Sequence, residues 1–220
     1  MISLTEENYL KALFHLSSEH GEVNVNDLSK HLDIKMPTVT SMMKKLAAKD
    51  LVKYESYKPL KLTAKGRTTA ALIIRKHRLT EMYLVEKMGF GWEEVHEIAE
   101  QMEHIHAPKL FAKMDEVMGF PAFDPHGSPI PDVNGKITGV EYQKLSSFKA
   151  GQTVMLSAVL NTNEDFLKYL NKQQLSLGDS LYIVDKEVFD GSMVIADANN
   201  KQIVLSALVC ERLLVVEQNS

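Results

Sequence analysis

The sequence predicts a mainly α-helical protein with a small β domain at its C-terminal end. Apolar residues recur at helical spacing from residue 4 to about residue 118, whereas from about residue 137 onward short segments have the pattern of strands. Between these parts, residues 119–135 are rich in proline, glycine and aspartate, which indicates a linker. Of the 220 residues, 45% are hydrophobic and 25% are charged, so the chain can bury a core and is not expected to be disordered.

The first 70 residues have the pattern of a winged helix-turn-helix domain. Apolar periodicity predicts three helices, over about 4–17, 25–32 and 36–48. Two short alternating segments then predict a hairpin, over 51–55 and 60–63. Three helices followed by a hairpin at this spacing are typical of winged-helix DNA-binding domains.

The charge of this first segment favours an anionic partner such as DNA. Residues 1–70 contain 11 lysines and arginines against 8 acidic residues, a net of +3, although the whole chain has a net charge of −4. The second helix of the motif would enter the major groove with small side chains, and lysines there and in the hairpin would contact phosphates. The candidate DNA contacts are Pro37, Thr38, Thr40, Ser41, Lys44, Lys45, Lys58 and Lys61. Winged helices also serve protein contacts, and that alternative stays open.

The middle of the chain carries a group of imidazoles and carboxylates. Three helices are expected there, over about 64–88, 92–106 and 108–118. On the second of them, four side chains share an arc of about 100° on a helical wheel: His96, Glu100, Glu103 and His104. On the preceding helix, His77 and Glu81 are four residues apart and also share a face. Such donors, without a thiolate, suit Mn(II), Fe(II), Co(II) or Zn(II), although a solvated polar face has the same pattern.

The C-terminal part, from residue 143 onward, has the pattern of a small β-barrel. Short strands are expected over 153–160, 180–188, 193–196, 203–208 and 213–217, with one helix over 167–175. The single cysteine, Cys210, excludes an intramolecular disulfide and a zinc–thiolate cluster and fits a reducing cytosol. No stretch is apolar enough for a membrane span, and the acidic N-terminus is unlike a signal peptide, so we expect a cytoplasmic protein with no membrane contact.

Several of these segments resemble one known family. The run RKHRLTE at residues 75–81 and the run HEIAEQMEH at residues 96–104 are similar to the diphtheria-toxin-repressor family of metal-dependent transcription regulators, and most similar to its manganese-responsive subgroup. The likeness extends to residues 36–40, 62–66 and 125–131. It implies a winged helix-turn-helix domain over 1–70, a helical metal-binding and dimerisation domain with a Pro/Gly-rich linker over 71–142, and an SH3-like barrel over 143–220.

The resemblance also implies two metal sites. The primary site would take Glu100, Glu103 and His104 from the middle helix and Asn8 from the first helix. Glu100 stands where iron-responsive members have cysteine, and its harder oxygen favours manganese. Asn8 stands where manganese-responsive members usually have aspartate, and the neighbouring Glu7 could substitute for it if the helix rotates. Lys11 stands where members with a binuclear site have glutamate, which argues against that second metal. The second site would draw on His77, Glu81, His96, Asp124, His126 and Asp165.

The function that the resemblance implies is a metal-activated, homodimeric repressor of metal-uptake genes. It would bind double-stranded operator DNA and would not be an enzyme. Manganese is the expected metal and iron the next candidate. The alternatives are an iron-responsive regulator of the same family, a metallohydrolase that uses the histidines and glutamates, and a metal-independent winged-helix regulator.

Overall fold

The computed structural model of the protein describes residues 2–160 and 162–218. The chain forms two compact units, each with a hydrophobic core of its own. The first unit consists of Met1–Thr80, Ala99–Gly119 and Ile130–Thr138. The second consists of Glu81–Ile98, Phe120–Pro129 and Gly139–Ser220.

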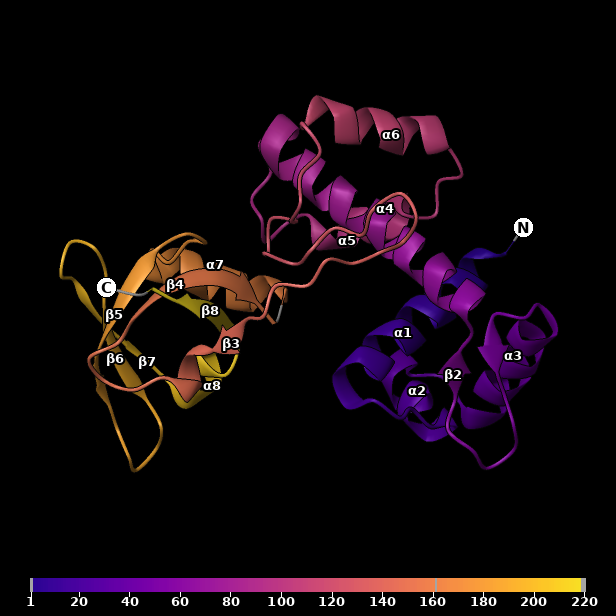
Figure 1. Ribbon diagram of the computed structural model, residues 1–220, viewed down its shortest axis with the longest axis horizontal. Coiled ribbons are helices and arrows are strands. Elements are labelled where there is room, and N and C mark those ends of the chain that lie inside the picture. The colour runs from indigo at the N-terminus through magenta and orange to yellow at the C-terminus, as the bar shows by residue number, and fades with distance from the viewer. Residues whose placement is uncertain (1, 161, 219–220) are drawn as a thin grey trace. The chain divides into compact units, whose positions relative to one another are not determined.

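The first unit begins with three helices that share one core (Figure 1). α1 (Leu4–His20) starts at a capping box, in which the Ser3 hydroxyl accepts a hydrogen bond from the Glu6 amide and the Glu6 carboxylate accepts one from the Ser3 amide. α2 (Val25–Leu32) and α3 (Met36–Ala48) follow. The apolar faces meet at fully buried side chains, among them Leu10, Leu13, Leu28, Met43 and Leu46. The three helices predicted from apolar periodicity are therefore confirmed.

A two-stranded wing follows these helices. β1 (Val52–Lys53) and β2 (Lys61–Leu62) are antiparallel, with Val52 opposite Leu62, and both are shorter than the predicted strands. The long helix α4 (Ala64–Met88) begins directly after β2. A Cβ atom at Gly66, in the first turn of α4, would lie 1.8 Å from the carbonyl oxygen of Leu51. Only glycine therefore allows α4 to start this close to the wing.

Two shorter helices complete the helical part of the chain: α5 (His96–Met102) and α6 (Pro108–Val117). The helix predicted over 92–106 is wrong at both ends. Before α5 the chain forms a turn, in which the Gly91 amide donates a hydrogen bond to the Glu94 carboxylate at 2.8 Å. Beyond α5, Pro108 disfavours a helical conformation at the residue before it, and Ala107 has φ −128° and ψ 80°.

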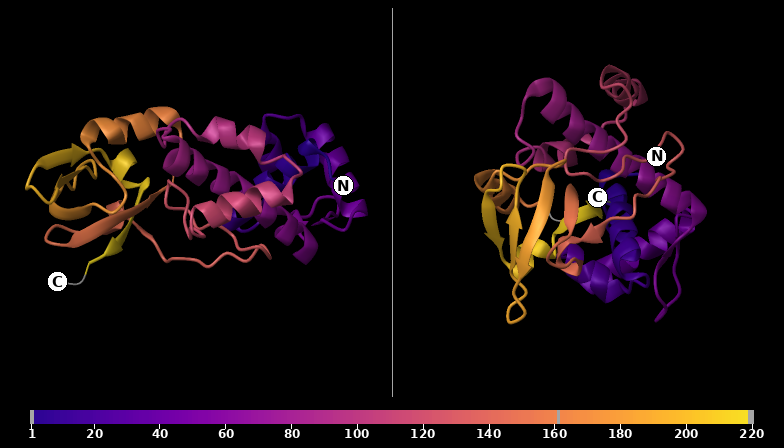
Figure 2. Two further views of the ribbon diagram at one scale, coloured as in Figure 1. Left: turned by 90° about the horizontal axis from the view of Figure 1, so that it is seen from above. Right: turned by 60° about the vertical axis from the view of Figure 1, so that its left-hand side comes forward.

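The second unit contains a six-stranded antiparallel sheet with the order β3-β8-β4-β5-β6-β7. Its strands are β3 (Gln143–Lys144), β4 (Thr153–Val159), β5 (Ser180–Lys186), β6 (Met193–Ala196), β7 (Gln202–Leu205) and β8 (Leu213–Glu217). Both views of this unit show α7 (Glu164–Gln173) lying beside the strands (Figures 1 and 2). Its buried face, Phe166, Leu167 and Leu170, belongs to the same core as the inward side chains of the strands.

Three small elements of this sheet domain were not predicted. They are β3, a 3₁₀ turn over Leu145–Ser147, and α8 (Ala207–Cys210). The strand expected over 203–208 ends at Leu205, because the Ser206 hydroxyl accepts a hydrogen bond from the Val209 amide and starts α8. Within residues 2–160 and 162–218, no helix is long and apolar enough to cross a bilayer.

Candidate metal centre

The first cluster of metal donors lies in the first unit, where the chain leaves α5. Glu103 and His104 follow the last residue of α5 in a turn, and the Glu103 side chain is completely buried. The His77 Nδ1 atom, from α4, lies 2.7 Å from Glu103 Oε2. The His104 Nδ1 atom lies 2.5 Å from Glu7 Oε2, and its Nε2 atom lies 3.6 Å from Glu103 Oε1. We call Glu7, His77, Glu100, Glu103 and His104 the primary cluster.

A lysine from α1 enters the primary cluster. The Nζ atom of Lys11 lies 2.7 Å from Glu100 Oε1, and 2.8 Å and 3.0 Å from the two carboxylate oxygens of Glu103. Burial acts to raise the pKa of Glu103, but the hydrogen bond from His77 and the positive charge of Lys11 hold that pKa below its usual value. The carboxylate is therefore ionised and already has a cationic partner, Lys11, supplied by the chain.

The structure places Glu7 where the sequence suggested Asn8. Glu7 is 3% exposed and contacts His104, whereas no contact between Asn8 and that histidine is found among the described residues. Glu7 and Lys11 are four residues apart in α1, so both face the primary cluster. Glu7 was the alternative to Asn8 in the sequence, and its spacing of four residues from Lys11 is the signal that places the two side chains together.

The second cluster of donors lies in the second unit and consists of Glu81, Asp124 and His126. All three residues are buried, at 2%, 6% and 1% exposed. Each offers a ligand atom, and these atoms lie within 4.8 Å of one another. Glu81 comes from α4, and the other two come from the loop that the sequence predicted as a linker.

The orientation of the His126 ring leaves one nitrogen directed toward this cluster. Its Nε2 atom lies 2.8 Å from the carbonyl oxygen of Trp92, so Nε2–H donates, and in the neutral ring Nδ1 carries the lone pair. The Nδ1 atom is buried, has no hydrogen-bond partner among the described residues, and lies 3.7 Å from Glu81 Oε2. A histidine whose other ring nitrogen donates to a carbonyl group is the usual arrangement of a metal ligand.

The loop that carries Asp124 and His126 is held firmly. Asp124 Oδ1 accepts hydrogen bonds from the amides of His126 and Ser128, both at 2.9 Å. Gly127 has φ +84°, and a Cβ atom there would lie 2.2 Å from the carbonyl oxygen of Ser157 in β4. Burial acts to lower the pKa of His126, but the carboxylates of Glu81 and Asp124 raise it above its usual value. The loop therefore presents a strongly negative site that suits a cation.

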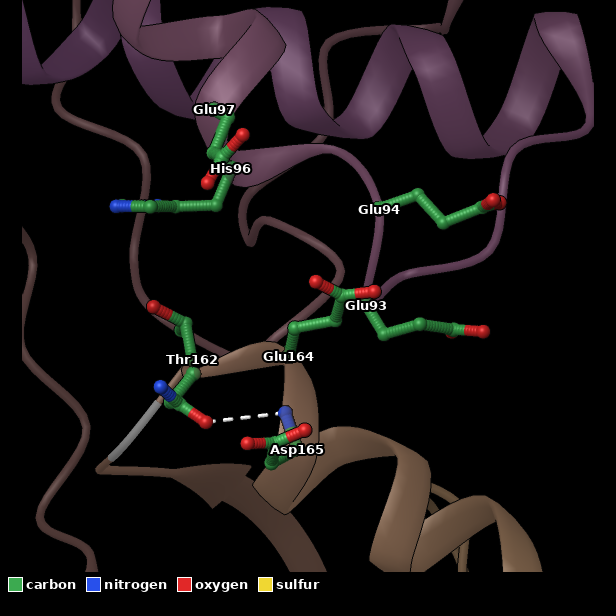
Figure 3. A pocket seen from close by; sticks show the side chains of 8 residues that line it. Glu93, Glu94, His96, Glu97, Thr162, Glu164 and Asp165 are labelled. Carbon is green, nitrogen blue, oxygen red and sulfur yellow. Dashed lines mark hydrogen bonds between the residues drawn. The ribbon is translucent and has the colours of Figure 1, made fainter.

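Of the other expected ligands of the second site, His96 contacts this triad through Glu81. His77 contacts Glu103 in the primary cluster. His96 Nδ1 lies 3.2 Å from Glu81 Oε1, and the His96 side chain is 43% exposed. His96 and Asp165 line a pocket together with the start of α7 (Figure 3). The remaining residues of this pocket are Glu93, Glu94, Glu97, Thr162, Asn163 and Glu164.

The candidate DNA contacts lie on one helix and on the wing of the first unit. Pro37, Thr38, Ser41, Lys44 and Lys45 are exposed on α3, and Thr40 is half-buried. Lys58 and Lys61 are exposed on the wing. Two of these lysines already have acidic neighbours, because Lys45 Nζ lies 3.4 Å from Glu6 and Lys58 Nζ lies 2.5 Å from Glu55.

Comparisons with known proteins decide the family. Residues 1–60 match the model of the iron dependent repressor N-terminal DNA binding domain, and residues 63–132 match that of the iron dependent repressor metal binding and dimerisation domain. The chain belongs to the diphtheria-toxin-repressor family. Residues 143–217 of this family member match the FeoA domain model, which confirms the predicted class of a helical part followed by an SH3-like β domain.

Curated members of the diphtheria-toxin-repressor family are similar over the N-terminal part. The diphtheria toxin repressor of Corynebacterium jeikeium is 32% identical over 136 residues, which is 62% of this chain and 57% of that protein. The iron-dependent repressor IdeR of Mycobacterium tuberculosis is 34% identical over 127 residues, 58% of this chain and 55% of that protein. These alignments therefore span only a little over half the length of the relatives.

Solved structures of the family match over nearly the whole chain. A manganese-dependent transcriptional repressor in complex with manganese has a TM-score of 0.86 and 28% identity, covering 97% of this chain and all of that one. The manganese regulator SloR has a TM-score of 0.76 and 28% identity, covering 97% of this chain and 98% of that one. Both the iron-responsive and the manganese-responsive branches of the family are thus represented among the similar proteins.

Proposed function

We propose that this protein is a metal-activated transcriptional repressor that binds operator DNA as a homodimer. The observation that carries the proposal is the buried triad of Glu81, Asp124 and His126, with the His126 Nδ1 lone pair directed into it. A buried set of two carboxylates and one imidazole is costly unless a cation or a proton balances its charge. Among the similar proteins, IdeR is an iron-dependent repressor, and one solved structure is a manganese-dependent transcriptional repressor in complex with manganese.

Glu81, Asp124 and His126 would hold the metal of the second site. All three donate oxygen or nitrogen, which suits Mn(II) as the first candidate and Fe(II) as the next. When bound, the ion supplies two positive charges and links α4 to the loop over 123–129. His96, which already contacts Glu81, and Asp165 are the other proposed members of this site. In the primary cluster, Glu100, Glu103, His104 and Asn8 are the donors that the family resemblance implies, but Lys11 already contacts Glu100 and Glu103 there.

The exposed face of α3 and the wing would form the DNA interface. The small side chains of Pro37, Thr38, Thr40 and Ser41 allow the helix to approach the base edges closely. Lys44, Lys45, Lys58 and Lys61 would neutralise phosphates.

The homodimer would form through the helical part of the chain, where residues 63–132 match the dimerisation model. Exposed apolar side chains near and on α6 support this proposal: Ile105, Leu110 and Val117. A two-fold dimer would present two α3 helices to a pseudo-palindromic operator. The regulated genes would be those of metal uptake, and the repressor would act in the cytoplasm.

An enzymatic role is not favoured. The similar proteins are repressors rather than enzymes. In addition, Glu81, Asp124 and His126 are each at most 6% exposed, so a metal held by them would have little access to a substrate. The metallohydrolase alternative therefore has no support in the structure.

The proposed function is tested by measuring DNA affinity as a function of metal concentration. An operator duplex would first be selected from a random library in the presence of Mn(II) and labelled with a fluorophore. The labelled duplex would then be titrated with protein in Mn(II), in anaerobic Fe(II) or in EDTA, and binding would be followed by fluorescence anisotropy. We expect metal to tighten binding by about tenfold or more, within the range of allosteric couplings. His126→Ala should remove most of this response.

His106→Ala is the matched control, because His106 is an exposed histidine outside both clusters. It should respond to metal as the wild type does. Equal affinity of the wild type with Mn(II), with Fe(II) and with EDTA would contradict the proposed function. A metal response that survives in His126→Ala would instead show that the metal binds elsewhere.

A further inference from the structure

The ammonium group of Lys11 occupies the centre of the primary cluster. Its Nζ atom contacts three carboxylate oxygens, one from Glu100 and two from Glu103, at 2.7, 2.8 and 3.0 Å. It donates hydrogen bonds to Glu100 Oε1 and Glu103 Oε2, whereas Glu103 Oε1 is an ion-pair contact without a hydrogen-bond partner among the described residues. The Lys11 side chain is 14% exposed and Glu103 is completely buried. The carboxylates that the family resemblance assigns to a metal ion are thus held by a cation of the chain itself.

This arrangement differs from an ordinary surface ion pair. Lys113 and Glu116, an exposed pair on α6, are 65% and 60% exposed, and water can replace either partner at little cost. Glu103 has no such freedom, because its buried carboxylate needs a cation whenever the protein is folded. Lys11 meets that need and also joins α1, the first helix of the DNA-binding head, to the turn after α5.

A metal ion and the Lys11 ammonium do not fit the primary cluster together. Carboxylate oxygens lie about 2.0–2.2 Å from a divalent transition metal. An ion bound to both Glu100 and Glu103 would therefore fall in the space where Nζ lies, and two cations at that separation repel strongly in a buried site. Metal binding would require the ammonium to leave three oxygen partners.

We propose that Lys11 is a built-in cation that takes the place of a metal ion in the primary cluster. It holds α1 against the turn after α5 in the absence of metal. The protein then binds one metal ion per chain, at Glu81, Asp124 and His126. This last part rests on the proposed function, whereas the role of Lys11 does not.

The proposal is tested by counting metal ions. Each variant would be dialysed against Mn(II), and bound manganese would be measured by plasma mass spectrometry. We expect one ion per chain in the wild type and none in His126→Ala. In Lys11→Gln/His126→Ala, the ammonium is gone and the primary cluster is open, so we expect one ion per chain again. The matched control Lys113→Gln/His126→Ala should bind none.

A second variant covers the case in which Lys11→Gln does not fold. Glu100 is 49% exposed, so Glu100→Gln should fold normally. If Lys11 occupies the primary cluster, Glu100→Gln leaves the metal content at one ion per chain. A content that falls by one ion in Glu100→Gln would overturn the proposal.

Two further outcomes would overturn the proposal. The first is that His126→Ala still binds one ion per chain and loses it when Glu103→Gln is added. The second is that Lys11→Gln/His126→Ala folds but binds no ion. A wild type without bound metal would count against the proposed function alone. The role of Lys11 would still be tested, because that test compares the manganese content of His126→Ala with that of Lys11→Gln/His126→Ala.

Discussion

Replacing Glu6 by glutamine should destabilise the DNA-binding head in a pH-dependent way. Glu6 is 1% exposed, and its Oε1 atom lies 2.7 Å from Lys49 Nζ and 3.4 Å from Lys45 Nζ. Its Oε2 atom accepts hydrogen bonds from the Ser3 amide at 2.7 Å and from Lys49 Nζ at 2.9 Å. Glu6→Gln keeps an oxygen that can accept the hydrogen bond from the Ser3 amide. It removes the negative charge that pairs with Lys45 in α3 and with Lys49 at the C-terminal end of α3.

The magnitude follows from the pKa of the carboxyl group. Burial acts to raise the pKa of Glu6, but Lys49, the Ser3 amide and Lys45 lower it from 4.5 to about 2. At about 1.4 kcal/mol per pKa unit, the difference between the unfolded and the folded pKa corresponds to at most about 3 kcal/mol of stability from the charge. Lys45 and Lys49 are 55% and 36% exposed, so water screens the pairs. We therefore expect a loss of about 1–2 kcal/mol in the free energy of unfolding.

The assay is urea unfolding of the wild type and Glu6→Gln in EDTA, followed by far-UV circular dichroism at several pH values. The folded pKa of about 2 lies below the unfolded value of about 4.5. The stabilisation is therefore fully present above about pH 5 and is lost as the pH falls from about 4.5 toward 2. The two proteins should differ most at pH 7, differ less at pH 3, and converge only below about pH 2. The fluorescence of Trp92, the only tryptophan, reports the second unit and should be unaffected.

Glu55→Gln is the matched control, because Glu55 pairs with Lys58 on the exposed wing, where both side chains are well solvated. It should leave the unfolding transition unchanged within error. Equal stability of Glu6→Gln and the wild type at pH 7 would show that the Glu6 charge does not stabilise the head. A difference in stability that is the same at pH 3 as at pH 7 would show that the ionised carboxylate is not its source.

Three further predictions concern metal and DNA binding. Gly127→Ala forces a Cβ atom to within 2.2 Å of the Ser157 carbonyl oxygen, so Mn(II) affinity measured by isothermal titration should fall by about 10–100-fold. Asp124→Cys replaces a hard donor with a soft one, so the concentration of Zn(II) that gives half-maximal operator binding should fall relative to that of Mn(II). An unchanged ratio of the two concentrations would remove Asp124 from the ligand set. Lys44→Ala should lower the slope of log affinity against log salt by about 0.9, and an unchanged slope would show that Lys44 touches no phosphate.

The sequence by itself determined the order and type of the main elements. The spacing of Leu10, Leu13, Leu28, Met43 and Leu46 follows the helical period, and all five side chains lie in one core. This succeeds because periodic burial is a local property that each helix displays in its own residues. The run of residues 96–104 and the RKHRLTE segment likewise identified the family, which the family models confirm.

Only the tertiary structure decided which donors meet. A helical wheel placed His96 and Glu103 on one arc, but α5 ends at Met102 and the two side chains have different partners, Glu81 and His77. The contact of Lys11 with Glu103 joins residues 92 positions apart in the chain. Such contacts depend on how helices pack, and a packing angle leaves no periodic trace in the sequence of either helix. The orientation of the His126 ring likewise depends on a distant contact, with the carbonyl oxygen of Trp92, 34 positions earlier in the chain.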